Sequence, residues 1–177
     1  MSEDPRLNIR YCPFCGSEHI ELRVPRRDDK RRPVCVECGW VHYVGPVVAA
    51  GLILHDGDKL CLVRRAHDPG LGKWSFPGGF VDLDEEVPEA ALREAVEETG
   101  CRAEVERLVG VYNSLGPGGK RVVIVVYAAR LTGDGAGGSE EVAEVRWFAR
   151  DELPWDEFAF ASSAEALRHY LKSGPEC

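Results

Sequence analysis

Residues 78–101, GGFVDLDEEVPEAALREAVEETGC, decide the fold of this chain. Pro88 suits the first turn of a helix, where its missing N–H has no intrahelical partner, and Gly100 suits the position just past a last turn. The stretch therefore predicts a helix between these two residues, preceded by a loop that carries two adjacent glycines.

The predicted helix has two unlike faces. At 100° per residue, its apolar residues fall along one side, which we expect to face the core: Ala91, Leu92, Ala95, Val96 and Thr99. The opposite side carries Glu94, Glu97 and Glu98. Carboxylates at these spacings repel by about 0.2–0.5 kcal/mol per pair, and the last two also lie at the negative end of the helix dipole. An acidic helix face is often simply exposed to solvent. The crowding of three carboxylates on this face favours a positively charged partner.

The spacing of the polar residues resembles a known motif. Gly79, Glu85, Arg93-Glu94, Glu97-Glu98 and Gly100 stand at the fixed polar and glycine positions of the Nudix box. The preceding run, Trp74-Ser75-Phe76-Pro77-Gly78-Gly79, is similar to the segment that enters many such boxes.

The box carboxylates suit a hard cation. Mg²⁺ or Mn²⁺ shares its coordination between a few carboxylates, water and substrate phosphates. The resemblance implies that Glu94, Glu97 and Glu98 are metal ligands, and the backbone carbonyl of Gly78 is a further candidate. Arg93 lies four residues before Glu97 and can brace that carboxylate, with Glu85 as a supporting partner.

The general base has two candidates. We expect Glu94 to take this role, with Glu144 as the alternative. Glu144 is the favoured member of an acidic segment, Glu140, Glu141 and Glu144, which resembles the loop that supplies a further carboxylate in many Nudix enzymes. These acids could equally be solvated.

Substrate contacts are less sharply marked in the sequence. Arg64 and Arg65 end a predicted strand and lead toward the box, so either could meet a phosphate, or both could simply be exposed. Trp74 is expected in the core or in the wall of the substrate pocket.

Length and composition indicate two unequal parts. The 177 residues allow one domain of about 130 residues and a small appendage, and Gly45-Pro46 marks the boundary between residues 1–45 and 46–177. A net charge of −8 argues against general nucleic-acid binding. The sequence shows no apolar run of membrane-spanning length and no signal-peptide pattern, so we expect a cytoplasmic protein without a membrane partner.

The first part carries two Cys-x-x-Cys-Gly turns. Cys12, Cys15, Cys35 and Cys38 have nearly the spacing of a four-cysteine zinc site, and such a closed site is structural. Short strands between the turns predict a zinc ribbon. Its hairpin is rich in arginine, which suits either a solvated tip or contact with nucleic acid.

The second part is expected to be a Nudix-type α/β/α sandwich with a mixed, curved sheet. Strands are predicted at 47–56, 60–65, 103–115, 121–131 and 141–148, with the box helix on one face. A final helix at 164–172, begun by a capping box of Ser162 and Glu165, should cover the other face. The glycine-rich segment 133–138 is expected to be a mobile loop.

The resemblance implies an activity. Within zinc-ribbon Nudix proteins, the segment 153–160, LPWDEFAF, looks more like the FAD and ADP-ribose pyrophosphatase group than the NADH pyrophosphatase group. We expect Mg²⁺-dependent hydrolysis of a nucleoside diphosphate linked to another group, such as ADP-ribose, FAD or NADH, with release of a nucleoside monophosphate. An RNA 5′-end hydrolase (acting on an NAD cap or a triphosphate) and a non-catalytic regulator that binds nucleotide or nucleic acid are the alternatives, and a homodimer is left open.

Overall fold

The structure, a computed structural model, describes residues 9–116, 119–133 and 139–173. Most of the glycine-rich segment expected to be mobile, 134–138, lies outside these residues. The chain divides into two compact units, Met1–Gly45 and Pro46–Cys177. No helix in the described part of the chain is long and apolar enough to cross a membrane.

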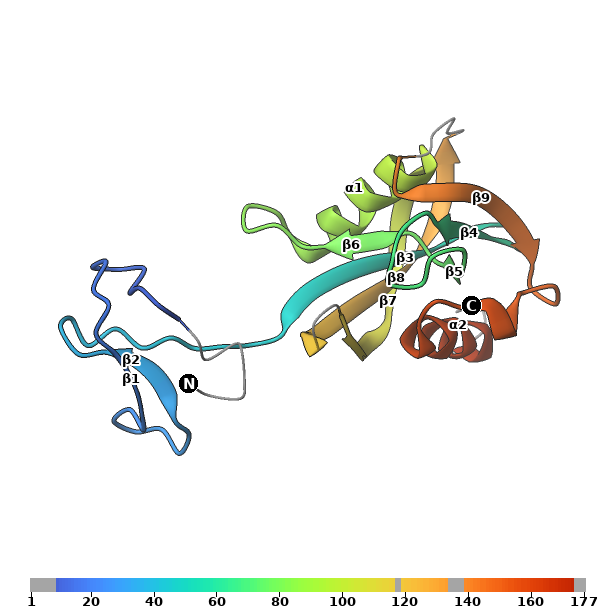
Figure 1. Cartoon of the computed structure of the whole chain (residues 1–177). Helices are drawn as coiled ribbons and strands as arrows, with labels where there is room; N and C mark the ends of the chain where they lie inside the picture. Colours follow the sequence, from blue (N-terminus) through green and yellow to red (C-terminus); the bar gives the residue numbers. More distant parts are fainter. Residues whose placement is uncertain (1–8, 117–118, 134–138, 174–177) are drawn as a thin grey trace. The chain divides into compact units, whose positions relative to one another are not determined.

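The first unit is a zinc ribbon, as predicted. Strands β1 (Ile20–Arg23) and β2 (Arg32–Cys35) pair antiparallel, with Ile20 opposite Cys35 (Figure 1). Each cysteine turn ends in a glycine with positive φ, 76° at Gly16 and 73° at Gly39. Glycine adopts this backbone at no steric cost, so each turn can fold back on itself.

The second unit is built on a seven-stranded mixed sheet. Its strands are β3 (Val47–Asp56), β4 (Lys59–Arg65), β5 (Trp74–Ser75), β6 (Gly78–Phe80), β7 (Arg102–Leu115), β8 (Arg121–Gly133) and β9 (Val142–Ala149). The order is β5-β4-β3-β8-β7, with β6 beside β3 and β9 beside β4. Strands β3 and β8 pair parallel and the other pairs are antiparallel, so the mixed sheet is confirmed.

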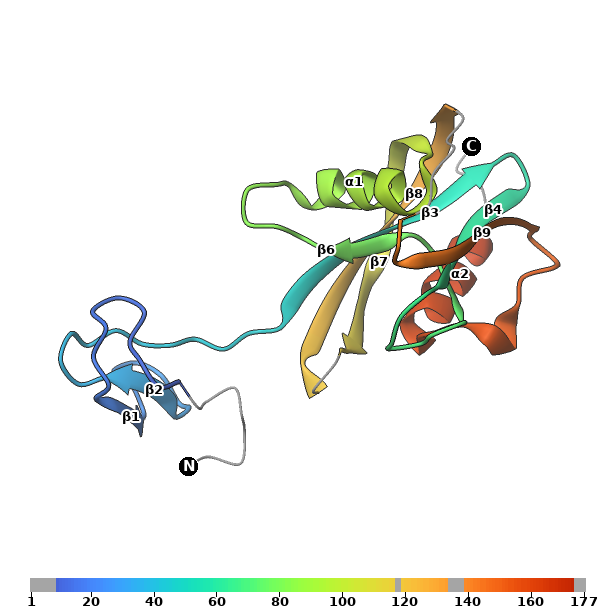
Figure 2. The ribbon, with the colours of Figure 1, turned by 45° about the horizontal axis from the view of Figure 1, so that its top comes forward.

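Two helices cover the two faces of this sheet. Helix α1 (Val87–Thr99) lies on one side and helix α2 (Ala161–Ser173) on the other (Figures 1 and 2). Alternation along β3 divides the core, because successive side chains of a strand point to opposite faces. Leu52 packs in the cluster with the buried alanines of α1, whereas Ile53 packs in the cluster with Leu167 of α2. The predicted α/β/α sandwich is confirmed.

The start of α2 differs from the prediction. The helix begins at Ala161, after a short 3₁₀ turn at Trp155–Glu157, so Ser162 lies within its first turn instead of capping it. The Ser162 hydroxyl is buried and has no hydrogen-bond partner among the described residues. The predicted capping box is therefore wrong, because three further residues, 161–163, join the helix at its N-terminus.

Candidate active site

A cavity of about 480 Å³ opens where α1, β6 and the start of α2 meet the sheet. Its acidic wall carries Glu94 and Glu98 of α1 and Glu141, which directly precedes β9. Apolar and aromatic side chains of β3, β8 and the segment before α2 line another part of the cavity. Polar residues also line it: Arg65, Asp68, Ser75, Asp82, Arg93, Ser114 and Ser163. The cavity therefore joins carboxylates, one strand-end arginine and an apolar floor.

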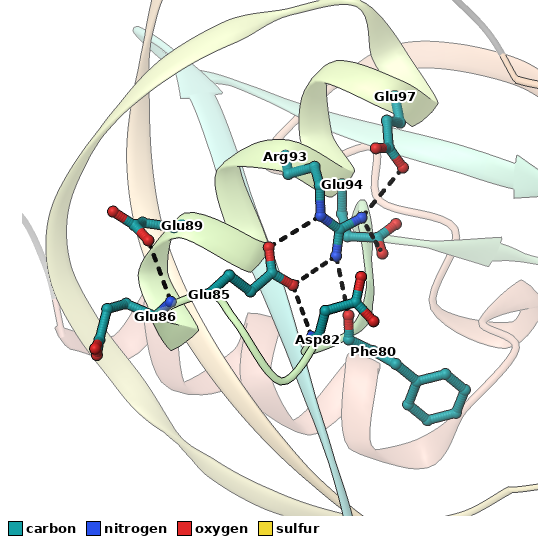
Figure 3. Close-up of polar contacts among 8 residues, drawn as sticks. All are labelled: Phe80, Asp82, Glu85, Glu86, Glu89, Arg93, Glu94 and Glu97. Atoms are coloured by element: carbon teal, nitrogen blue, oxygen red, sulfur yellow. Dashed lines mark hydrogen bonds and ion pairs between the residues drawn. The ribbon is translucent and has the colours of Figure 1, made fainter.

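Arg93 holds the acidic wall together (Figure 3). Its guanidinium donates two hydrogen bonds to Glu85, at 3.0 and 2.8 Å, and one to the carbonyl of Phe80 at 3.1 Å. It also donates to Glu94 at 2.9 Å and to Glu97 at 3.2 Å. The bonds from Arg93 lower the pKa of Glu85 to about 2. The loop before α1 and the helix face are thus fixed to each other by a single side chain.

Glu98 is buried, contrary to the expectation that all three box carboxylates share an exposed face. It is 6% exposed and accepts the backbone N–H of Gly78 at 2.9 Å, while Val96, expected in the core, is 45% exposed. The buried side of α1 therefore includes its alanines and Glu98. Val96 lies outside this buried side. Burial raises the pKa of Glu98 to about 7, although the Gly78 N–H and the nearby charge of Arg65 act in the opposite direction.

The two glycines of β6 permit this close packing. A Cβ on Gly79 would lie 2.3–2.7 Å from the carboxylate of Glu94, and a Cβ on Gly78 would lie 2.5 Å from the carbonyl oxygen of Ala50. Real Cβ atoms do not approach other atoms so closely. Strand β6 therefore needs glycine at 78 to lie this close to the backbone of β3, and glycine at 79 to leave the Glu94 carboxylate in its present position.

The acidic wall fits a hard divalent cation. Glu94 and Glu98 are carboxylates withdrawn from water, and burial raises the pKa of both. A buried carboxylate whose negative charge is not fully neutralised by its neighbours needs a proton or a cation. Glu97 is 54% exposed and turns toward Arg93, so the three carboxylates do not converge in this structure. Gly78 lines the cavity and offers Glu98 its N–H.

The acidic segment before and within β9 is arranged differently from the prediction. Glu141 lines the cavity, and Glu144 does not. Glu144 stands opposite Arg64 in the β4–β9 pairing, accepts a hydrogen bond from Arg146 and lies 3.6 Å from Arg64. The pairing register directs Glu144 away from the cavity, and this register is not visible in the sequence.

Of the two neighbouring arginines, only Arg65 lines the cavity. Arg64 points to the other face of β4 and donates to the carbonyl of Gly72 at 2.8 Å. Trp74, expected in the core or the pocket wall, is 3% exposed and packs edge-on against Phe148 with ring centroids 5.0 Å apart. Of the two places expected for Trp74, it therefore lies in the core, and it does not line the cavity.

Sequence reasoning missed several residues that line the cavity: Ser75, Phe80, Phe160 and Ser163. No local pattern marks them. Phe160 and Ser163 lie about sixty residues beyond the box in the chain, and only the position of α2 on the sheet brings them to it.

The zinc ribbon holds a separate cluster. The four Sγ atoms of Cys12, Cys15, Cys35 and Cys38 all lie within 4.8 Å of one another, and the Cys12–Cys38 and Cys15–Cys35 sulfurs are 3.6 Å apart. Four thiolates bound tetrahedrally at 2.3 Å from zinc would be about 3.8 Å apart. In the described part of the chain, this is the one place where three or more metal-ligating side chains converge.

Known proteins resemble both units. The family described as "NUDIX domain" matches residues 45–170, and the family described as "Nudix N-terminal" matches residues 10–44. An ADP-ribose pyrophosphatase of Methanocaldococcus jannaschii is 35% identical over 141 residues, which cover 78% of each chain. A NAD-capped RNA hydrolase NudC of Pseudomonas aeruginosa is 27% identical over 146 residues, covering 82% of this chain and 49% of that protein. The crystal structure of a NUDIX hydrolase from Nitrosomonas europaea has a TM-score of 0.82 and 35% identity, covering 94% of this chain and 92% of that one.

Proposed function

Because this chain belongs to the NUDIX family and is a NUDIX hydrolase, we propose that it cleaves the diphosphate of a nucleoside diphosphate linked to another group. ADP-ribose, FAD and NADH are the substrate types, and a nucleoside monophosphate is one product. The observation that carries this proposal is the cavity, which is lined by the carboxylates of Glu94, Glu98 and Glu141 and also by Arg65. The similarity to an ADP-ribose pyrophosphatase supports it.

The carboxylates would hold Mg²⁺ or Mn²⁺. Glu94 and Glu98 would be the primary ligands, Glu97 would be a third ligand at the exposed end of the wall, and the carbonyl of Gly78 would be a further candidate. A bound divalent cation supplies neutralisation of the diphosphate charge and a lowered pKa for water. Glu94, 14% exposed in its side chain, remains our choice to accept the proton of the attacking water. Glu141 takes the place that the sequence suggested for Glu144, since it lines the cavity.

Arg93 and Glu85 position this machinery. With five hydrogen bonds to the loop and the helix, the Arg93 guanidinium is held in one orientation and is not free to follow a substrate. Its charge also reduces the repulsion between Glu94 and Glu97. We therefore assign Arg93 to the geometry of the acidic wall, and not to substrate binding.

The cysteine cluster would hold a structural Zn²⁺. Four cysteines leave no coordination position open, so the metal would support the ribbon without taking part in hydrolysis.

A substrate panel tests the proposal. ADP-ribose, FAD, NADH, a dinucleoside polyphosphate and NAD-capped RNA should be assayed at saturating Mg²⁺. We expect hydrolysis of at least one of the three small diphosphates, with a nucleoside monophosphate among the products. Activity on capped RNA alone would favour the function named for the NudC relative, and activity without any divalent cation would contradict the mechanism.

The same assay distinguishes the acidic wall from an ordinary charged surface. Glu98→Gln removes one ligand charge and should lower kcat by ~10²-fold or more, as loss of one electrostatic stabiliser usually does. Glu104→Gln is the matched control, because Glu104 is 67% exposed in its side chain and its one ion pair among the described residues is with Arg130 at 2.7 Å. Equal activity of the two variants would rule out α1 as the catalytic element.

A further inference from the structure

Arg65 is held in place with part of its guanidinium unused. Its Nε donates to the carbonyl of Pro69 at 2.7 Å, and its Cζ lies 5.4 Å from the centre of the Phe160 ring. Within the described residues, its two terminal nitrogens make no hydrogen bond and no ion pair. Asp68 lines the same cavity, but its carboxylate accepts the N–H of Leu71 and forms no ion pair with Arg65. The guanidinium is thus oriented by the protein and still able to donate.

Two buried hydroxyls lie in the wall of the same cavity. Ser75 of β5 is 8% exposed and Ser163 of α2 is 2% exposed, and their oxygens are 3.4 Å apart. Each hydroxyl can donate one hydrogen bond. Since the two share at most one bond and have no other partner in the described part of the chain, one hydroxyl hydrogen stays available. The pair can therefore offer one hydrogen bond to an acceptor group of a ligand in the cavity.

The N-terminal end of α2 adds an electrostatic field that attracts anions. The helix has thirteen residues, and both Phe160, directly before it, and Ser163, in its first turn, line the cavity. The N-terminal end of a helix carries partial positive charge and attracts anions. Arginine, hydroxyls and a helix N-terminus together match the negative charge and the several acceptor oxygens of a phosphoryl group.

We infer that Arg65, Ser75 and Ser163 form a phosphate subsite that binds a phosphoryl group without help from a metal ion. The inference rests on the proposed function, since it takes the substrate to be a diphosphate. One phosphate of that substrate lies at the acidic wall with its cation. The other lies against Arg65, and the group attached to it meets the Phe160 ring.

Binding in the absence of metal tests the subsite. Isothermal titration in EDTA should compare AMP with adenosine, and ribose 5-phosphate with ribose, using the full-length protein. We expect each phosphorylated compound to bind about tenfold or more tightly than its partner, since bonds between charged groups are the stronger class. Inorganic phosphate should compete with AMP and with ribose 5-phosphate for binding.

Two variants have matched controls. Arg65→Gln should remove the preference for the phosphorylated compound, whereas Arg64→Gln, on the other face of β4, should keep it. Ser163→Ala should weaken AMP binding about tenfold to a hundredfold, as loss of one hydrogen bond to a charged group does. Ser162→Ala should leave binding unchanged, because that hydroxyl does not line the cavity.

Equal binding of AMP and adenosine, no detectable binding of either at millimolar concentration, or equal effects of Arg65→Gln and Arg64→Gln would overturn the subsite. These results can be distinguished from a failure of the proposed hydrolytic function. Phosphate binding that depends on Arg65 in a protein that hydrolyses none of the diphosphates would preserve the subsite and reject the activity.

Discussion

At the scale of single residues, the acidic wall combines carboxylates in opposite electrostatic states. Glu85 is stabilised as an anion by Arg93, which lowers its pKa to about 2. Glu98 is destabilised as an anion by burial, which raises its pKa to about 7. The pairing of Glu85 with Arg93 fixes the geometry of the acidic wall. The buried Glu98 keeps a negative charge that a cation can neutralise. Residues of the same type in one motif therefore do different work because their surroundings differ.

The raised pKa of Glu98 predicts a pH dependence of stability in the metal-free protein. A carboxyl group whose pKa is about 7 when folded and near 4.5 when unfolded disfavours folding once it must ionise. Its favourable contribution is complete below pH 4.5 and is lost as the pH rises to about 7. We expect the free energy of unfolding, from urea titrations in EDTA, to fall by about 1–3 kcal/mol between pH 5 and 8 relative to Glu98→Gln.

Mg²⁺ serves as the control for this prediction. At pH 8 the cation should restore the stability of the unchanged protein and should have little effect on Glu98→Gln. Parallel pH profiles of the two proteins in EDTA would show that the Glu98 carboxyl is not destabilised by burial.

At the scale of elements, α1 is placed by the strand that passes beneath it. Strand β6 lies between β3 and the acidic wall, and its two glycines meet different neighbours. Gly78 approaches backbone atoms of β3, whereas Gly79 approaches the end of the Glu94 side chain. Backbone cannot yield without moving the sheet, but a carboxylate can rotate away. The same sequence pattern, Gly-Gly, thus supports the fold at one residue and the site at the next.

This difference predicts opposite outcomes for two alanine substitutions. Gly78→Ala should lower the free energy of unfolding by about 2 kcal/mol or more, as overpacking against a rigid neighbour does. Gly79→Ala should cost less than about 1 kcal/mol and should still lower kcat strongly, because Glu94 is displaced. Chemical denaturation and steady-state kinetics measure the two effects. A Gly79→Ala enzyme with full activity would show that the position of Glu94 is unimportant.

At the scale of the whole molecule, two units keep their stability in different ways. The ribbon of residues 1–45 has two four-residue strands and a four-cysteine cluster, so a metal must supply much of its folding energy. The unit of residues 46–177 has a sheet packed on both faces by helices. Loss of metal should therefore have unequal consequences for the two units.

We predict one Zn²⁺ per chain and a ribbon that unfolds without it. Cys35→Ser should lose zinc and protection from amide hydrogen exchange in residues 10–40, while the second unit keeps its protection. Metal analysis and exchange measured by mass spectrometry report both effects. Cys61→Ala is the control, since Cys61 is buried in the second unit and should leave the zinc content unchanged. Disulfides within the two Cys-x-x-Cys turns of protein purified from a reducing cytosol would contradict the zinc site.

The sequence by itself determined the features that depend on residues close together in the chain. The box helix follows from Pro88, Gly100 and the apolar period between them, and the zinc ribbon follows from two short cysteine turns. The layered fold could also be predicted, because the order of strands and two helices suits a mixed sheet covered on both faces. The continuous apolar run at 121–131 also indicates a strand buried on both faces. Local backbone geometry and side-chain period are fixed within a few residues, so these predictions needed no tertiary information.

The tertiary structure alone decided which residues share the cavity. Whether Glu141 or Glu144 faces the box depends on the register between β9 and β4, and hydrogen bonds between distant strands set that register. The burial of Glu98 depends on the rotation of α1 above β3 and β6, which packing of the whole helix determines. Ser163 and Phe160 reach the cavity only because α2 closes the opposite face of the sheet. These are contacts between segments far apart in the chain, and no local pattern encodes them.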